Sequence, residues 1–101
     1  MKKVRFHPDA EAEMSAAAAY YETQQEGLGG RFLAATQEVA NRISINPSLY
    51  RPVQGDVRRC LAKVFPYGML FRDLPDGIII IAVMHLHRDP DYWKARVAPS
   101  G

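Results

Sequence analysis

Cysteine is almost absent from this sequence, which holds Cys60 and no other. A single cysteine excludes an internal disulfide, and such sparing use of cysteine is typical of proteins in a reducing cytoplasm. Because no motif places a base beside Cys60, we interpret this residue as a small buried hydrophobe on a strand rather than as a nucleophile.

Long hydrophobic runs are missing as well. The longest apolar run extends from Ile78 to Met84, far short of the roughly 20 residues that span a bilayer. The opening Met1-Lys2-Lys3 leads into a short alternating segment and not into the apolar core of a signal peptide. We therefore expect a cytoplasmic protein without membrane association.

Several motifs of enzyme chemistry are not found. There is no phosphate loop, no dinucleotide-binding fingerprint and no Gly-x-Ser-x-Gly turn. His85 and His87 share a strand face, and two carboxylates follow them, which could begin a zinc site. No spacing fixes a third ligand, however, and Pro90 breaks the strand geometry. We interpret the histidines as a strand-end pair and expect neither a metal nor a cofactor.

Net charge is small, and its distribution is uneven. The formal value of +2 is too weak to indicate a nucleic-acid partner by itself. Residues 1–50 hold five Lys/Arg against six Asp/Glu, whereas residues 51–101 hold eight against five. The basic side chains of the second half lie near histidines, aromatic residues and predicted strand ends. This arrangement fits either phosphate and base binding or an ordinary basic sheet edge.

The chain is long enough for one domain, with 101 residues of which 48% are hydrophobic. Alternating polarity over residues 4–6 predicts a short strand, and Pro8 opens a helix that ends at Gly27, a left-handed residue. Gly29-Gly30 starts a second helix, which Pro47 terminates. Because the loop between them is short, the helices are expected to form an antiparallel hairpin.

Three strands are predicted in the second half, over Val57–Val64, Tyr67–Asp73 and Ile78–Leu86. Residues 48–56 are interpreted as a connector, and the short connections between the strands require antiparallel pairing. The predicted fold class is therefore α+β in the order β-α-α-β-β-β. It comprises an N-terminal strand, an antiparallel helical hairpin and a three-stranded antiparallel meander, in a single domain over residues 1–101.

The last predicted strand is apolar on both faces, which is typical of a central strand covered on both sides. Strict alternation assigns one face to Ile78, Ile80, Ala82 and Met84, and the other to Ile79, Ile81 and Val83. A helical hairpin covers a single face, so the second face needs the C-terminal segment or another polypeptide. We take this as a first indication of an obligate partner.

A cluster of cations could hold a phosphodiester while a histidine or tyrosine moves the proton. Its candidate members are Arg58 or Arg59, Lys63, Arg72, Arg88 and Tyr92. Alternatively, these residues are solvated strand ends, with Tyr92 and Trp93 packing the C-terminal segment onto the sheet. Packing is the favoured interpretation for Trp93, and for Arg88 both interpretations stand.

Short motifs over nearly the whole chain add a family resemblance. They are Phe6-His7-Pro8-Asp9-Ala10, Tyr20-Tyr21, Gly27–Phe32, Pro47, Arg58-Arg59, Phe65-Pro66-Tyr67, Ala82–His85 and Arg88–Trp93. In this order and spacing, the sequence resembles the RelE/ParE superfamily of toxins from type II toxin–antitoxin systems. The resemblance implies a helical hairpin packed on an antiparallel sheet, and an antitoxin that wraps the toxin through a flexible C-terminal segment.

Two activities are known among such toxins. RelE-like members cut mRNA in the ribosomal A site, and the matching set here is Arg59, Lys63, Arg72, Arg88 and Tyr92. ParE-like members poison DNA gyrase and lack that set. Gly68 and Leu61 stand where RelE-like nucleases carry an arginine and a lysine, so the resemblance favours a ParE-like toxin.

The expected function is growth inhibition by a toxin of a plasmid-stabilising type II module, which poisons DNA gyrase and assembles with its cognate antitoxin into a hetero-oligomer. The residues expected to contact the target are Arg58, His85, His87, Arg88 and Trp93. Such a toxin is not an enzyme, whereas the RelE-like alternative is a ribosome-dependent mRNA endoribonuclease. A third alternative is a small nucleic-acid-binding domain without toxicity.

Overall fold

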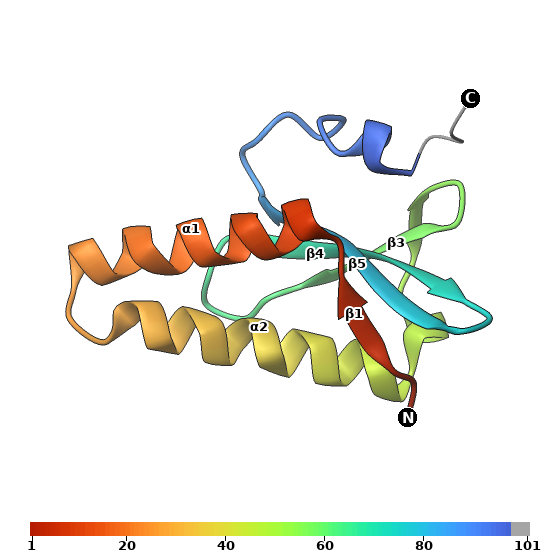
Figure 1. Cartoon of the computed structure of the whole chain (residues 1–101), viewed down its shortest axis with the longest axis horizontal. Coiled ribbons are helices and arrows are strands. Elements are labelled where there is room, and N and C mark those ends of the chain that lie inside the picture. Colours follow the sequence, from red (N-terminus) through yellow and green to blue (C-terminus); the bar gives the residue numbers. More distant parts are fainter. Residues whose placement is uncertain (98–101) are drawn as a thin grey trace.

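The computed structural model describes residues 1–97, which form a helical hairpin, a five-stranded sheet and a short C-terminal segment. The elements are β1 (Val4–Phe6), α1 (Pro8–Gln24), α2 (Leu28–Ile45), β2 (Pro52–Gln54), β3 (Val57–Leu61), β4 (Tyr67–Leu74) and β5 (Gly77–His85), with 3-10 turns at Pro47–Leu49 and Lys94–Arg96. In Figure 1 the two helices run side by side, and the turn that joins them projects beyond the sheet. The predicted α+β class is confirmed.

Local sequence sets the limits of the helices. Pro8 occupies the first turn of α1, where its missing N–H is not needed, and His7 Nδ1 accepts a hydrogen bond from the Asp9 N–H at 3.0 Å. After α1, Gly27 adopts a left-handed φ of 86°, as its position predicted. Within residues 1–97, no helix has both the length and the apolar character needed to cross a membrane.

Glu22 closes the hairpin. Its carboxylate accepts the N–H groups of Gly27 at 2.9 Å and Gly29 at 3.0 Å, which caps the start of α2. The helices approach so closely here that a Cβ on Gly29 would lie 2.5 Å from the carbonyl oxygen of Ala18. Packing therefore requires glycine at position 29, whereas a Cβ on Gly30 would meet open space.

The sheet order is β1-β5-β4-β3-β2, so the N-terminal strand lies beside the last strand. β1 runs parallel to β5, with Val4 opposite Ile78, and the other pairs are antiparallel, as predicted for the meander. The predicted connector contributes an additional strand, β2, in which Pro52 pairs with Arg58. The strand was not predicted because so short a segment, which contains a proline, leaves no period to detect.

The turn between β3 and β4 also departs from the prediction. β3 ends at Leu61, and Val64, predicted as the end of this strand, is exposed with a positive φ of 72°. The Phe65 N–H donates to the Lys63 carbonyl and the Tyr67 N–H donates to the Phe65 carbonyl, so two γ-turns form the corner. A β-branched residue with positive φ is rare, and no sequence signal indicates it.

A β-bulge in β5 changes which side chains face the helices. Leu70 pairs with Ala82 and Phe71 pairs with Ile80, so Ile81 has no partner on β4. The core under the helices receives Ile78, Ile80 and Val83, and the opposite face receives Ile79, Ile81, Ala82 and Met84. The predicted faces were therefore wrong from Ala82 onward, because an extra residue shifts the alternation by one.

Two hydrophobic cores lie on the two faces of the sheet. The larger core packs the hairpin onto the sheet around Phe32 and Phe71, and it contains Cys60, where burial raises the pKa of the thiol. The smaller core lies under the C-terminal segment, where Trp93 is 3% exposed and packs with Leu70. The chain itself thus covers the second face of β5, and this face does not require an obligate partner.

Candidate functional site

A groove of about 280 Å³, which we term the α1–β5 groove, lies between α1 and the ends of β4 and β5. Its lining comprises Glu13, Ala16, Ala17, Tyr20, Tyr67, Val83, His85 and Arg88. The alanines keep this side of α1 narrow, and the strand register places Tyr67 opposite His85 at the end of the sheet. The groove is therefore a concave surface with aromatic and imidazole rings and one guanidinium group along it.

Glu13 connects three distant segments of the chain. β1 ends opposite Ile80, so the edge of β5 beyond that point has no neighbouring strand among the described residues. The Glu13 carboxylate accepts the Val83 N–H there at 3.1 Å, and Arg96 donates to the Ile81 carbonyl at 2.9 Å. These two side chains bind backbone groups that a longer β1 could have paired.

Arg96 and Glu13 form a nearly buried, bidentate ion pair. The guanidinium donates to the two carboxylate oxygens at 2.8 and 3.1 Å, and the side chains are 13% and 14% exposed. Burial by itself raises the pKa of Glu13, but hydrogen bonding, chiefly from Arg96, lowers the pKa below its usual value. The carboxylate therefore stays charged at neutral pH and fastens the C-terminal segment to α1.

Arg88 lies over the ring of Tyr92 beside the groove. Its guanidinium carbon is 3.6 Å from the ring centre, and its Nη1 atom is 3.4 Å from a Glu13 oxygen. The side chain is 52% exposed, so it remains accessible to a ligand. Stacking and ion pairing hold a planar cation in a fixed orientation, which suits recognition of a phosphate or a carboxylate.

Tyr92 contributes its ring rather than its hydroxyl. The hydroxyl oxygen is buried near Glu13, without a well-formed hydrogen bond to any described residue. Burial first, and then the Glu13 carboxylate, raises the pKa of Tyr92 above its usual value. The tyrosine is therefore neutral near physiological pH and unsuited to act as a base there.

His85 and His87 lie together at the end of β5. The Nδ1 atom of His85 accepts the backbone N–H of His87 at 3.1 Å, and the ring centres are 5.2 Å apart. His85 also meets Tyr67 edge to face, with the ring centres 5.1 Å apart. Across residues 1–97, no three His, Cys, Asp or Glu side chains are grouped so that they could hold a metal ion. The histidine pair thus takes part in packing at the groove.

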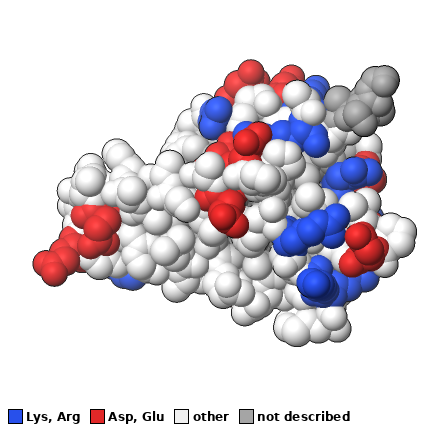
Figure 2. Space-filling model, viewed as in Figure 1, with Lys and Arg blue, Asp and Glu red and all other residues white. Residues whose placement is uncertain are grey.

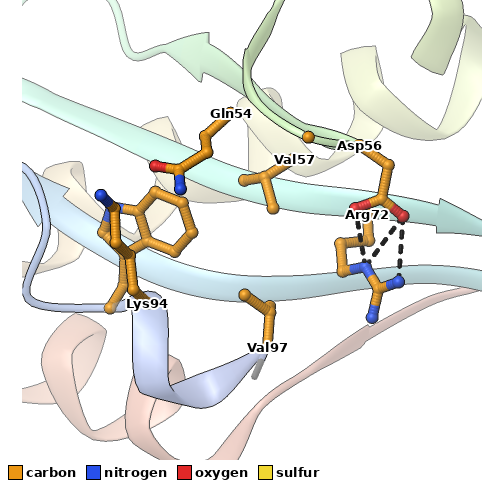
Figure 3. Close-up of a pocket in the computed structure, with 8 residues that line it drawn as sticks. Gln54, Asp56, Val57, Arg72, Lys94 and Val97 are labelled. Carbon is orange, nitrogen blue, oxygen red and sulfur yellow. Dashed lines mark hydrogen bonds and ion pairs between the residues drawn. The ribbon is translucent and has the colours of Figure 1, made fainter. Parts of the chain in front are cut away.

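Arg72 does not join this groove. It lies opposite Ile79, at the far end of β4 from Tyr67. Its guanidinium binds both oxygens of Asp56 at 2.9–3.1 Å, as Figure 3 shows, and this bonding holds the pKa of Asp56 below its usual range. Arg72 is therefore neutralised at a distance from Arg88.

Lys63 and Arg59 are also placed elsewhere. Lys63 lies in the turn after β3, 3.8 Å from the Glu38 carboxylate of α2. Arg59 lies on the face of the sheet that the C-terminal segment partly covers, with its side-chain stem over Gly68. The five residues of the nuclease hypothesis therefore do not form one cluster in this structure.

The residues expected to contact the target are divided between the groove and the protein interior. Arg58 is partly buried and donates to a loop carbonyl, and Trp93 is buried in the smaller core. His85 and Arg88 line the groove, and His87 packs against His85. The structure thus brings three of these residues to one end of the sheet and leaves the other two in packing positions.

Charge is distributed over the molecule much as the sequence predicted. On the face shown in Figure 2, Lys and Arg side chains lie mostly over the sheet half, and acidic side chains lie both at the tip of the hairpin and among the basic ones. Much of the hairpin surface between them is uncharged, in agreement with the exposed Ala12, Ala16 and Ala19 of α1. An uncharged helical face therefore borders the groove.

Sequence reasoning missed Glu13 and Arg96. A signal for Glu13 was present, because it lies three residues after Ala10 and four before Ala17, both buried, so its carboxylate stands on the buried side of α1. No comparable signal marks Arg96, whose partner is 83 residues away in the chain. The pair becomes visible only when the C-terminal segment is folded onto the sheet.

Comparison with known proteins gives a consistent result. The sequence matches the family described as ParE toxin of type II toxin-antitoxin system, parDE, over residues 4–90. The fold is similar to that of a solved structure described as a chromosomal ParDE TA system from P. aeruginosa, with a TM-score of 0.63 and 16% identity over 86% of this chain and 98% of that chain. No curated protein sequence matches this chain. The chain therefore belongs to the ParE toxin family of type II toxin–antitoxin systems.

Proposed function

We propose that this ParE-family toxin inhibits growth by poisoning DNA gyrase in the cytoplasm, and that a cognate antitoxin neutralises it. The observation that carries this choice of target is the state of the nuclease candidates. The Tyr92 hydroxyl is buried and uncharged, and Lys63 and Arg72 are paired with carboxylates. Without a tyrosine that can move a proton or free cations around one phosphate, the chain acts by binding rather than by cleavage.

Arg88 is the proposed centre of the gyrase-binding surface. Its stacking on Tyr92 and its ion pair with Glu13 reduce the number of orientations it can adopt before binding. The neighbouring groove offers apolar surface on α1 and rings from Tyr67 and His85. A planar cation beside such a concavity suits an acidic group on gyrase or a DNA phosphate held by gyrase.

The antitoxin is proposed to dock one of its helices on the helical hairpin. The outer face of α1 exposes small side chains, and Tyr20, which is 59% exposed, lines the α1–β5 groove. Small residues let a second helix approach closely, and few charges would have to be desolvated on the middle of the hairpin, which is largely uncharged on the face shown in Figure 2. A helix bound there lies beside the groove, so the hetero-oligomer blocks access to Arg88.

Induction of the chain in cells separates the two candidate targets. Poisoned gyrase leaves broken DNA, so replication should stop and the DNA-damage response should rise while mRNA stays intact. Primer extension that finds new 5′ ends inside translated codons within minutes, dependent on the ribosome, would identify an endoribonuclease and reject the proposal. Unaffected growth in the presence of the folded chain, without its antitoxin, would reject toxicity altogether.

A further inference from the structure

Two cavities flank Trp93 on the face of the sheet opposite the helices. One of about 280 Å³ is lined in part by Val57, and one of about 120 Å³ is lined in part by Leu70. Gln54 and Trp93 line both cavities, so the two are parts of one groove between the β2–β3 hairpin and the C-terminal segment, which we term the Trp93 groove. Figure 3 shows the larger part, with the Gln54 side chain directed toward it.

The floor of the Trp93 groove is apolar. Leu70 and Met84 are buried beneath its smaller part, and the exposed side chains of Val53 and Leu61 continue the apolar surface outward over β2 and β3. Gln54 stands in the middle and carries an amide that can both donate to and accept from a peptide backbone. This combination suits an extended segment that carries aliphatic side chains.

One cation beside the groove is uncompensated. Two ion pairs beside the groove are each neutral overall. The nitrogen–oxygen distance is 2.9 Å in Asp56–Arg72 and 3.1 Å in Asp91–Lys94. Arg59 takes part in none of the ion pairs formed within residues 1–97. The groove therefore presents one positive charge that an acidic ligand could neutralise.

Gly68 places Arg59 over the sheet. A Cβ at position 68 would lie 3.3 Å from both the Cγ and Cδ atoms of Arg59, so the absence of a side chain there makes room for the arginine stem. The stem crosses β4, and Arg59 lines the smaller cavity. A guanidinium held beside an apolar cavity suits a carboxylate that neighbours an aliphatic side chain.

We propose that the Trp93 groove binds an extended peptide of a protein partner, in which aliphatic side chains alternate with carboxylates. Alternate side chains of an extended peptide point in opposite directions, so the aliphatic set can enter the groove while a carboxylate reaches Arg59. A single-stranded nucleic acid fits less well, because Trp93 is buried and no exposed ring lines the described groove for base stacking. This site is separate from the α1–β5 groove and does not depend on gyrase as the target.

Trp93 is the single tryptophan of the chain, so its fluorescence can be used to follow binding in the Trp93 groove. We expect that a synthetic hexapeptide alternating leucine and glutamate changes the tryptophan emission of the full chain in a saturable way. Arg59→Glu should weaken this binding at least about tenfold, because attraction becomes repulsion. Arg31→Glu is the matched control, since Arg31 is exposed on α2 and has no ion pair within the described chain, and it should leave binding unchanged.

Arg59→Gln, which keeps a stem over Gly68, provides a second variant if Arg59→Glu fails to fold. It should weaken binding about threefold to tenfold. The proposal is overturned if the acidic peptide gives no saturable change, or if a peptide with lysine in place of glutamate binds as well. Tighter binding of a single-stranded oligonucleotide, or an emission change on raising the protein concentration alone, overturns it in favour of nucleic acid or of a second copy.

Discussion

At the residue scale, Arg88 is held by the Tyr92 ring and by Glu13, and half of its side chain remains exposed. Arg88→Ala should abolish growth inhibition. Arg88→Lys should retain little growth inhibition, because an ammonium group does not reproduce the planar guanidinium stacked on Tyr92. The free energy of unfolding should fall by at most about 1 kcal/mol, since the ion pair is partly exposed. Growth inhibition and thermal unfolding are measured on the same variants.

Arg31→Ala is the matched control for Arg88→Ala, because it removes another exposed arginine from a different surface. It should remain fully toxic. If Arg88→Ala also remains fully toxic, or loses toxicity only because it unfolds, Arg88 has a structural role and the proposed binding surface is wrong.

Trp93 should behave in the opposite way from Arg88. Its indole fills the smaller core and donates to the Pro90 carbonyl at 2.6 Å. Trp93→Ala should lower the free energy of unfolding by about 3–5 kcal/mol, and Trp93→Phe by clearly less, because it retains most of the apolar volume. Urea unfolding followed by circular dichroism measures both. If Trp93→Ala lowers the free energy of unfolding by less than about 1 kcal/mol, the packing of Trp93 on the sheet does not stabilise the fold.

Glu13→Gln should lower the free energy of unfolding at neutral pH by about 2–4 kcal/mol, because it leaves the nearly buried Arg96 with only the exposed Asp9 as a counter-charge. The pKa of Glu13 is lowered in the folded state from a value of 4.5. The stabilisation that the charged Glu13 carboxylate provides is therefore complete above pH 4.5. It is lost as the pH falls through the pKa that Glu13 has in the folded protein.

The difference in stability between the unchanged chain and Glu13→Gln should accordingly shrink below pH 4.5. Glu11→Gln, at an exposed position of the same helix, is the control and should show little difference at any pH. Urea unfolding over a range of pH provides the measurement. A difference that stays constant from neutral pH to about pH 3 would mean that Glu13 is not the titrating group.

The sequence indicated the exposed residues of the candidate site but not the residue that orients Arg88. Arg88 and His85 could be singled out because cations and imidazoles near a strand end carry a local signal. The partner that orients Arg88 is Glu13, on α1, and no local pattern encodes a contact across 75 residues. Arg58 and Trp93 carry the same kind of signal, yet one is partly buried against a loop and the other fills a core.

At the scale of the elements, helices were predicted better than strands. Pro8, Gly27 and Pro47 act through their own backbone geometry, so the helix limits can be read locally. The faces of β5 depend on how β5 pairs with β4, and the bulge at Ile81 belongs to that pairing rather than to either strand alone.

The close approach of α1 and α2 gives a test at the scale of the elements. Gly29→Ala should destabilise the protein by about 1–3 kcal/mol, because the new Cβ would lie 2.5 Å from a backbone carbonyl oxygen and the helices must move apart. Gly30→Ala, one residue on, meets open space and should stabilise by about 0.5–1 kcal/mol through helix propensity. Thermal unfolding compares the two variants. Equal effects would show that the helices are not in close contact at Gly29.

At the scale of the whole molecule, the C-terminal segment completes the packing of the fold. It covers the second face of the sheet through Trp93, carries Arg88 and Tyr92 to the α1–β5 groove, and is fastened to α1 by Arg96. The two apolar faces of β5 therefore do not indicate an obligate partner, contrary to the expectation from the sequence. Among residues 1–97, the surfaces open to partners include the largely uncharged middle of the hairpin and the two grooves.

Cleavage of plasmid DNA by purified gyrase, in the presence of the purified chain, tests the central claim most directly. We expect cleaved plasmid to accumulate with the unchanged chain, to depend on gyrase, and to disappear with an Arg88→Ala variant whose unfolding curve matches that of the unchanged chain. A folded chain that inhibits growth yet leaves gyrase-dependent cleavage and supercoiling unaltered would contradict the claim.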